Sequence, residues 1–459
     1  MHEVPRPAAI GSCRRPVVPS SRPAVASVLL LFLAVATATA PAAAQDLSAV
    51  ERRIVSYVDA HNGEAMAFLE RIVNINSGTM NFAGVEAVGR EFLSELEALG
   101  FDARWIPMDR TGRAGHVFAE RSGGTGNTVL LIGHLDTVFE SDSPFQQWEW
   151  MDSVTARGPG TEDMKGGDVV LLYALKALQA ADALDGANII VALTGDEEDT
   201  GDPLELARAD LVEAGRRADI ALGFEGGVGG TNTATVARRG FTGWILRVRG
   251  TPAHSSQVFR EDLGSGAIYE AARVLNAFRE ELAGERYLTF NPGLILGGTS
   301  IDFDRSQSRG TAFGKTNVIA EHALAAGDLR TITTKQRERA KSRMREIVAR
   351  NLPHTSAEIE FRDSYPPMAP TDANYDLLRE LDAASRDLGL GAVEPVDPGL
   401  RGAADVSFVA DLVDAALDGL GIAGEGGHTE DERVDLRSLP IQTKKAAVLI
   451  YRLTRGEGT

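Results

Sequence analysis

Several histidines and carboxylates stand directly after short apolar runs of this sequence. His134 and Asp136 follow the run 129–132 in "GHLDTVF". Residues i and i+2 of a strand point to the same face, so Asp136 can accept one ring N–H of His134 while the other nitrogen binds a cation. An alternative interpretation fits the same sequence equally well: the histidine lies in a turn, and the aspartate near it has no role.

Four consecutive carboxylates, Asp196 to Asp199, end another apolar run in "VALTGDEEDTGDP". They form either a solvated turn or a site for something cationic, because like charges this close raise one another's pKa unless a cation compensates. Adjacent Glu197 and Glu198 are expected to point in different directions, one toward a metal and the other toward a water at that metal. Asp196 and Asp199 are expected to be solvated or structural.

Three further residues extend this set: Asp163 in "GPGTEDMKGG", Glu225 in "LGFEGG" and His428 in "GEGGHTEDE". Each is weak evidence alone, and Asp163 can equally be the N-terminal charge of the helix that follows it. Two histidines with several carboxylates are, however, the inventory of a dinuclear metal site, in which one carboxylate bridges ions ~3.5–4 Å apart.

The elements that must position these residues alternate between helices and continuous apolar strands. Residues 47–99 have helical periodicity, and Gly100 ends the second helix. The later alternation predicts an α/β catalytic domain with a mostly parallel central sheet flanked by helices, formed by residues 45–240 and 363–459. Ligands of such sheets lie at the carboxyl ends of the strands, where the candidate residues stand.

The pattern changes between residues 241 and 362. A strand at 244–250, a helix at 265–282, strands at 288–298 and 317–332, a helix at 335–351 and a strand at 357–363 follow one another. This β-α-β-β-α-β order predicts an inserted two-layer α+β domain.

The composition limits the kinds of partner and the kinds of metal ion that the protein is expected to bind. The 459 residues contain 47 Lys+Arg and 65 Asp+Glu, a net charge of −18, which argues against nucleic acid or an anionic membrane as a partner. Residues 1–44 combine arginines, the apolar run 27–39 and "APAAAQ", which predicts a cleaved signal peptide and export to the periplasm or the medium, with no membrane association after cleavage. Cys13, the only cysteine, lies in that segment, so any metal is held by His and carboxylates, which favours Zn, Mn or Co.

The ordered motifs GHLDTV, GPGTEDMKGG, GDEE, a strand-end Glu and GGHTEDE resemble the zinc-dependent family of aminoacylases, carboxypeptidases and deacylases, and within it the secreted glutamate carboxypeptidases. The resemblance covers nearly all of the chain after residue 44. It implies two zinc ions per subunit, with Co or Mn as substitutes.

The resemblance also implies roles for single residues. His134 and Glu225 bind one zinc, Glu198 and His428 bind the other, and Asp163 bridges both, with a cis peptide bond after it. Asp136 stands behind His134, and Glu197 is the general acid/base.

The inserted domain is similar to the lid and dimerisation domain of that family. "RGTPAHSSQ" contains His254, which matches a lid histidine that reaches the scissile carbonyl, in dimeric members from the partner subunit. Asn317 and Arg330 match a pair that holds the substrate's carboxylate, for which an Arg fork is suited. The resemblance therefore also implies a homodimer formed through this domain.

Two stretches depart from the family pattern. "GLRGAADVSF" has Arg401 and Ala403–Ala404 where a loop richer in Ser and Gly is usual before the aspartate, here Asp405. Pro252 replaces a smaller residue before His254. Neither change removes an implied catalytic group. Both change residues on which the identity of the substrate is expected to depend.

The implied function is hydrolysis of the amide or peptide bond to a C-terminal amino acid with a free carboxylate. The nearest alternative is a deacylase of N-acyl amino acids. More distant alternatives are an aminopeptidase or dipeptidase, for which no site for a free α-amine is evident, and an inactive metal-binding homologue.

Overall fold

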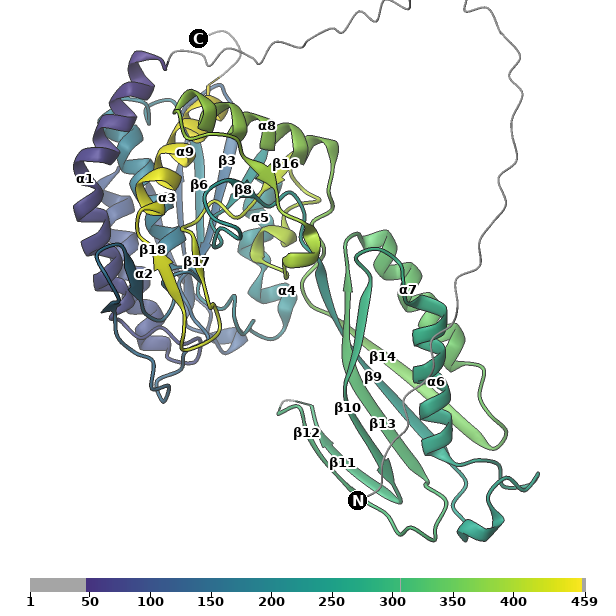
Figure 1. Cartoon of the computed structure of the whole chain (residues 1–459). Coiled ribbons are helices and arrows are strands. Elements are labelled where there is room, and N and C mark those ends of the chain that lie inside the picture. The colour runs from purple at the N-terminus through teal and green to yellow at the C-terminus, as the bar shows by residue number, and fades with distance from the viewer. Residues whose placement is uncertain (1–46, 306, 456–459) are drawn as a thin grey trace, which may run out of the picture. The chain divides into compact units, whose positions relative to one another are not determined.

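The computed structural model describes residues 47–305 and 307–455 (Figure 1), and the predicted signal peptide lies outside these residues. Within the described ranges, no helix has the length and apolarity needed to cross a membrane. The helices are α1 (Ala49–Val73), α2 (Phe82–Ala98), α3 (Lys165–Ala180), α4 (Leu204–Ala207), α5 (Ala209–Arg217), α6 (Ala267–Leu282), α7 (Thr334–Val348), α8 (Asp372–Asp387) and α9 (Ser438–Leu453).

The strands belong to a central sheet, a second four-stranded sheet and smaller pairings. The central strands are β1 (Asp102–Pro107), β2 (Gly115–Arg121), β3 (Thr128–His134), β6 (Asn188–Thr194), β7 (Ile220–Gly223) and β16 (Ala415–Leu417). The second sheet contains β9 (Gly240–Gly250), β10 (Thr289–Gly298), β13 (His322–Thr331) and β14 (Thr355–Asp363). The short strands are β4 (Glu149–Trp150), β5 (Thr155–Arg157), β8 (Thr233–Ala234), β11 (Ser300–Asp304), β12 (Arg309–Phe313), β15 (Glu394–Pro395), β17 (Gly424–Glu425) and β18 (Arg433–Asp435).

The central sheet has the order β1-β2-β6-β3-β7-β16. The strands β6, β3, β7 and β16 are parallel, whereas β2 is antiparallel to both of its neighbours. Helices α1, α3 and α9 pack together on one face, and α5 contacts β3 and β6. The predicted α/β class with a mostly parallel central sheet is confirmed.

The sequence of β3 explains why both faces of this sheet are covered. Val129 and Leu131 belong to the core cluster that contains the side chains of α1, α3 and α9, whereas Leu130 and Ile132 belong to a separate cluster with α5. Because successive side chains of a strand point to opposite faces, an unbroken apolar run is the pattern of a strand buried on both sides.

The ends of the first two helices follow from local chemistry. Ser48 caps α1 in a reciprocal capping box with Glu51. Gly100 follows α2 at a φ of 79°, a left-handed conformation that glycine adopts without steric cost. The helices expected from the periodicity of residues 47–99 are therefore present, with a break between residues 73 and 82.

The second sheet is antiparallel, with the order β10-β13-β9-β14, and helices α6 and α7 pack on it. Trp244, Leu246 and Val248 alternate along β9 and enter one cluster with the buried side chains of both helices. This is the β-α-β-β-α-β order expected for the inserted segment 241–362, which is called the lid after the domain that it resembles.

One part of the lid differs from the expectation. The hairpin of β11 and β12 lies between β10 and β13, where no strand was predicted. Its sequence "SIDFD" alternates polar and apolar residues, which is the pattern of a strand with one covered face. No element was predicted for this segment, which stands between two stronger apolar runs.

A small sheet, β17-β18-β5-β4, joins segments that are far apart in the sequence. Strand β18 pairs with β5, with Val434 opposite Ala156. The pairing therefore brings the glycine-rich loop after β5, which contains Asp163, beside the glycine-rich loop before β18, which contains His428.

Candidate metal centre

The candidate residues converge on one edge of the central sheet. His134 ends β3, Glu197 and Glu198 follow β6, and Glu225 follows β7. These three strands are parallel neighbours in the order β6-β3-β7, so their carboxyl ends meet at the same edge.

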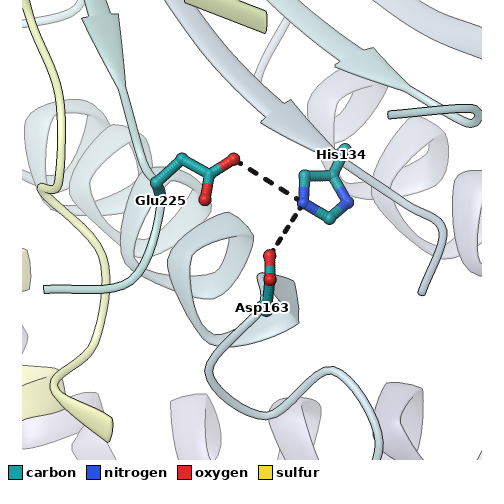
Figure 2. Close-up of side chains that lie close together, drawn as sticks. All are labelled: His134, Asp163 and Glu225. Atoms are coloured by element: carbon teal, nitrogen blue, oxygen red, sulfur yellow. Dashed lines mark hydrogen bonds and ion pairs between the residues drawn. The ribbon is translucent and has the colours of Figure 1, made fainter. Parts of the chain in front are cut away.

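Asp163 faces His134 and Glu225 through its first carboxylate oxygen (Figure 2). Its Oδ1 lies 3.1 Å from Nε2 of His134, and the same nitrogen lies 3.7 Å from Oε1 of Glu225. The three side chains offer ligand atoms within 4.8 Å of one another, which is the spacing of a group that can hold one metal ion.

The second oxygen of Asp163 faces a different pair. Oδ2 lies 3.1 Å from Nε2 of His428, and that nitrogen lies 3.2 Å from Oε2 of Glu198. This second group also satisfies the 4.8 Å spacing. Asp163 is therefore shared by both groups, and the peptide bond between Asp163 and Met164 is cis, as the resemblance implied.

Asp136 is fully buried and contacts His134 in the expected way. Nδ1 of His134 lies 3.1 Å from the backbone carbonyl oxygen of Asp136 and 3.4 Å from its Oδ1. A carbonyl oxygen only accepts hydrogen bonds, so Nδ1 carries the proton and Nε2 is the nitrogen available to a metal.

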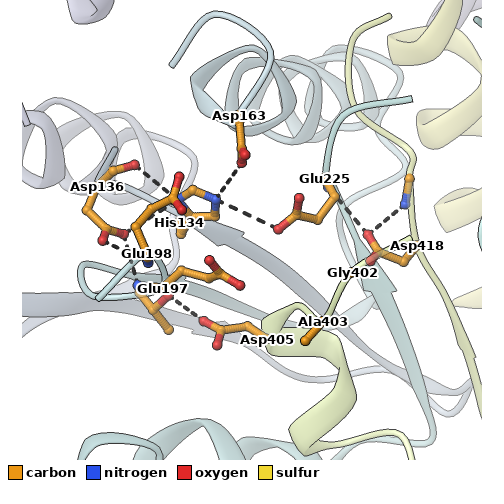
Figure 3. Close-up of polar contacts among 12 residues, drawn as sticks. His134, Asp136, Asp163, Glu197, Glu198, Glu225, Gly402, Ala403, Asp405 and Asp418 are labelled. Carbon is orange, nitrogen blue, oxygen red and sulfur yellow. Dashed lines mark hydrogen bonds and ion pairs between the residues drawn. The ribbon is translucent and has the colours of Figure 1, made fainter. Parts of the chain in front are cut away.

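The four carboxylates after β6 have separate surroundings. The side chains of Glu197 and Glu198 diverge (Figure 3), as expected from their adjacent positions. Asp196 is buried and binds Arg208 and the N–H of Gly201, so its role is structural. Asp199 is exposed and pairs with Arg113 at 2.8 Å.

Burial and like charge raise the pKa values of the clustered glutamates. Burial, with the negative charge of Asp163, raises the pKa of Glu198 to about 7. Burial likewise raises the pKa of Glu225 to about 7, against the opposing charge of Arg238. The pKa of Glu197 is raised well above its usual range by burial and by the nearby charges of Glu225 and Asp405.

Hydrogen bonds between histidines and carboxylates favour the charged forms of His428 and Asp163. Hydrogen bonds to Asp163 and Glu198 raise the pKa of His428 to about 11. Burial opposes the ionisation of Asp163, but its hydrogen bonds to the two histidines outweigh burial and lower its pKa.

The donor set fits metal ions. Each group offers one imidazole nitrogen and carboxylate oxygens, the ligands of zinc, manganese or cobalt in the absence of thiolates. Oε1 of Glu198 is buried and makes no hydrogen bond within the described residues. A buried acceptor without a donor is costly, and a cation would satisfy it.

Glu432 supports Asp163 and was not singled out from the sequence. Its Oε1 accepts the backbone N–H groups of Glu162, at 2.7 Å, and Asp163, at 3.0 Å, and its Oε2 accepts that of Gly160 at 3.0 Å. Glu432 is fully buried, and burial raises its pKa to about 7. The signal in the sequence was the last acidic residue of "GGHTEDE", which lies four residues after His428.

Two buried arginines lie behind Glu225. Nη2 of Arg238 is 3.6 Å and Nη2 of Arg401 is 3.9 Å from its Oε2, and Arg238 also binds Asp418. Arg401, one of the departures from the family pattern, therefore contributes positive charge beside a candidate ligand. Asp405 contacts neither group of ligands but binds Thr194 and Arg208.

Arg330 lines the same cleft as Glu197, Glu198 and His428, a cavity of about 950 Å³. Its Nε donates to Oδ2 of Asp328 at 2.9 Å, and its guanidinium carbon lies 4.6 Å from the centre of the Phe241 ring. These contacts fix the direction of the guanidinium group.

His254 and Asn317 lie together elsewhere on the lid. The N–H of Ser255 donates to the carbonyl of Asn317 at 2.9 Å, and Nδ1 of His254 lies 2.8 Å from Oγ of Ser256. Neither residue lines the cleft of Arg330. The structure therefore does not bring Asn317 and Arg330 of one chain together.

The register of the lid sheet shows how far apart they are. Arg330 pairs with Phe241 at the start of β9, whereas His322 pairs with Arg249 at its end, next to the segment of His254. Eight residues of strand separate these pairs, or roughly 26 Å at ~3.3 Å per residue.

A mostly parallel sheet with candidate metal ligands at the carboxyl ends of its strands is compatible with a metal-dependent hydrolase. Residues 130–452 match the Peptidase family M20/M25/M40, and the chain belongs to this family. The family is metal-dependent, and its members are hydrolytic enzymes, so the chain is a hydrolase.

Two curated relatives cover most of the chain. Carboxypeptidase G2 of Pseudomonas sp. (strain RS-16) is 26% identical over 403 residues, which is 85% of this chain and 89% of the relative. Succinyl-diaminopimelate desuccinylase of Nitrosospira multiformis is 25% identical over 384 residues, 79% of this chain and 90% of the relative.

Solved structures agree in fold. The aminopeptidase PepT of Bacillus cereus superposes with a TM-score of 0.68 at 17% identity and covers 86% of this chain and 99% of its own. The YXEP protein of Bacillus subtilis, described as a dinuclear metal binding peptidase from the M20 family, gives a TM-score of 0.62 at 15% identity and covers 86% and 99%.

Proposed function

We propose that the protein is a di-zinc hydrolase that cleaves the amide or peptide bond to a C-terminal amino acid with a free carboxylate. The observation that carries this proposal is the sharing of Asp163 between two groups of ligands, with Glu197 beside them in a cleft that also contains Arg330. The similarity to Carboxypeptidase G2 supports the carboxypeptidase assignment.

His134 and Glu225 would hold one zinc ion, Glu198 and His428 the other, and Asp163 both. The bound ions supply Lewis-acid chemistry, which lowers the pKa of water and polarises a carbonyl group. Asp136 holds the His134 ring with Nε2 toward the site.

Glu197 accepts the proton of the attacking water as general base and then returns it to the leaving amide nitrogen as general acid. Burial and neighbouring carboxylates raise the pKa of Glu197, which favours uptake of a proton by this carboxylate. Arg330 binds the substrate's carboxylate, for which a planar guanidinium group is suited.

The activity is tested with Glu197→Gln, which keeps the size of the side chain but cannot take up a proton. The expected result is loss of hydrolysis with two zinc ions still bound per chain, measured by elemental analysis. Glu205→Gln, on the short helix α4, is the matched control. A fully active Glu197→Gln enzyme would refute the role of Glu197.

A deacylase of N-acyl amino acids is the second candidate, favoured by the similarity to succinyl-diaminopimelate desuccinylase. The two candidates share the metal ligands, Glu197 and Arg330 and differ in the acyl partner. A panel of C-terminal glutamyl peptides, N-acyl amino acids and N-succinyl amines, compared by kcat/KM, separates them. Peptides with a free α-amine and a blocked C-terminus test the more distant aminopeptidase candidate.

We further propose that the enzyme is a homodimer formed through the lid, with His254 and Asn317 completing the site of the second copy. The distance between these residues and Arg330 within one lid supports this proposal, because one chain cannot place both at one substrate. Light scattering gives the oligomeric state. Mixing the inactive variants Arg330→Ala and His254→Ala should restore activity, since each heterodimer contains one intact site, whereas a monomeric enzyme stays inactive.

Export to the periplasm or the medium is also proposed, on the pattern of residues 1–44. Cell fractionation and N-terminal sequencing of the recovered protein test it. Recovery of a full-length chain from the cytoplasm alone would contradict it.

A further inference from the structure

A buried guanidinium group lies beneath the segment after β6 that contains Glu197. Arg208 is 1% exposed, and every nitrogen of its guanidinium group donates a hydrogen bond. Nε donates to Oδ1 of Asp405 at 2.8 Å, Nη1 to Oδ1 of Asp196, and Nη2 to the carbonyl of Asp196 at 3.1 Å.

Arg208 also fixes the hydroxyl group of Tyr365. Nη2 of Arg208 donates to the Tyr365 oxygen at 3.0 Å, so the hydroxyl proton is free to point elsewhere. That hydroxyl donates to the backbone carbonyl of Glu197 at 2.7 Å. The ring of Tyr365 is held by Phe408, with the ring centres 4.9 Å apart.

The backbone of Glu197 is therefore held at both polar groups. Its carbonyl accepts from Tyr365, and its N–H donates to Oδ1 of Asp136 at 3.0 Å. The preceding residues are also anchored, because Thr194 donates through Oγ1 to Asp405 and the N–H of Gly195 donates to Nδ1 of His116 at 3.1 Å. In contrast, the Glu197 side chain forms no hydrogen bond or ion pair with the described residues 47–305 and 307–455, so its direction depends on its backbone.

We propose that Tyr365 and Arg208 are positioning residues that aim the carboxylate of Glu197 at the reacting water. The inference rests on the proposed function. Tyr365 contacts the residue that performs the proton transfer, and Arg208 acts through Tyr365 and Asp196. Neither residue is a candidate metal ligand, because each lies outside both groups of ligand atoms.

The first test is Tyr365→Phe, which removes one hydroxyl group from a buried ring and leaves its packing against Phe408. The expected result is a fall in kcat of about tenfold or more, since small misplacements of a catalytic group are costly. KM and the number of bound zinc ions should stay unchanged, because neither the cleft arginine nor a metal ligand is altered. Tyr173→Phe, at a buried tyrosine of α3, is the matched control.

A second measurement separates positioning from general stability. In a Glu197→Asp enzyme, whose shorter carboxylate is already displaced, Tyr365→Phe should lower kcat by a smaller factor than in the wild-type enzyme. Independent effects would multiply instead. Arg208→Lys, with unfolding monitored to confirm a folded enzyme, should lower kcat in the same way as Tyr365→Phe.

An unchanged kcat in Tyr365→Phe overturns the inference, and so does a loss of bound zinc or multiplicative behaviour in the double variant. These results differ from a failure of the proposed function. If the Glu197→Gln enzyme is active, the role of Glu197 itself is refuted. If the Glu197→Gln enzyme is inactive but the Tyr365→Phe enzyme is fully active, only the positioning role is refuted.

Discussion

Asp136 accepts the backbone N–H of Glu197 at 3.0 Å through the carboxylate that also lies beside the His134 ring. Its second oxygen accepts the N–H of Glu198 at 3.1 Å and the hydroxyl of Thr79 at 2.7 Å. One buried side chain therefore connects a candidate ligand on β3 with the two glutamates after β6.

Asp136→Asn is expected to lower both zinc affinity and kcat. An amide nitrogen in place of one oxygen donates instead of accepting, so one N–H group of the 197–198 segment loses its acceptor. The affinity loss should be about 10–100-fold, which is typical when a group behind a metal ligand is changed. Zinc titration against a competing chelator measures it, and wild-type affinity would contradict the role.

Glu432→Gln is expected to weaken zinc binding without removing a ligand. Glu432 accepts hydrogen bonds from three backbone N–H groups of the loop that contains Asp163. A glutamine amide has only one acceptor oxygen, so it can accept only some of these hydrogen bonds. Calorimetric zinc titration measures the change. Glu425→Gln is the control, because its partner Arg433 lies with it at the surface and exposed ion pairs contribute little.

Removal of the metal is expected to lower the thermal stability of the protein. Asp163, Glu198 and Glu225 crowd negative charge that a cation compensates, and a ligand that binds only the folded state stabilises it. Calorimetry with and without a chelator gives the shift in Tm, and added zinc should reverse it. An unchanged Tm would show that the cluster does not bind metal under those conditions.

Lys445 is expected to make the free energy of unfolding rise with pH above about 8. Burial lowers its pKa from 10.5 to about 8, so the unfolded chain binds more protons than the folded protein between those values. The penalty is complete below pH 8 and is relieved as pH rises toward 10.5. Urea unfolding at pH 8 and pH 10 should show a smaller rise for Lys445→Met, and equal rises would contradict the assignment.

Leu130→Ala and Leu131→Ala are each expected to destabilise the protein by about 2–5 kcal/mol. The two adjacent side chains enter different core clusters on opposite faces of the central sheet, and both are fully buried. Urea unfolding of each variant measures the loss. A cost below 1 kcal/mol for one of them would mean that its face is not packed as described.

The parts of the fold that depend on local pattern could be predicted from the sequence. Continuous apolar runs such as 129–132 identify strands buried on both faces, and the alternation with helices gives the parallel sheet. The hairpin of β11 and β12 was missed because short, half-exposed strands have a weak pattern, so neighbouring stronger runs dominate the interpretation.

The site could be predicted where a motif states both residue type and place, as for His134 and Asp163. The residues that support the site from behind could not be predicted from the sequence. Arg208 and Tyr365 come from segments 157 residues apart, and only the folded chain shows that they meet beneath Glu197. Long-range hydrogen bonds of this kind leave no periodic pattern in the sequence. A buried arginine therefore cannot be distinguished there from a surface arginine.

The small sheet that pairs β5 with β18 brings together segments that are synthesised far apart in time. His428 lies 265 residues after Asp163, so the ribosome completes most of the chain before the second group of ligands can exist. A nascent or truncated chain that ends before β17 would contain His134, Asp163 and Glu225 but lack His428 and the loop clamp of Glu432. The second group of candidate ligands would thus be a property of the completed chain alone, and an interrupted synthesis product would lack it.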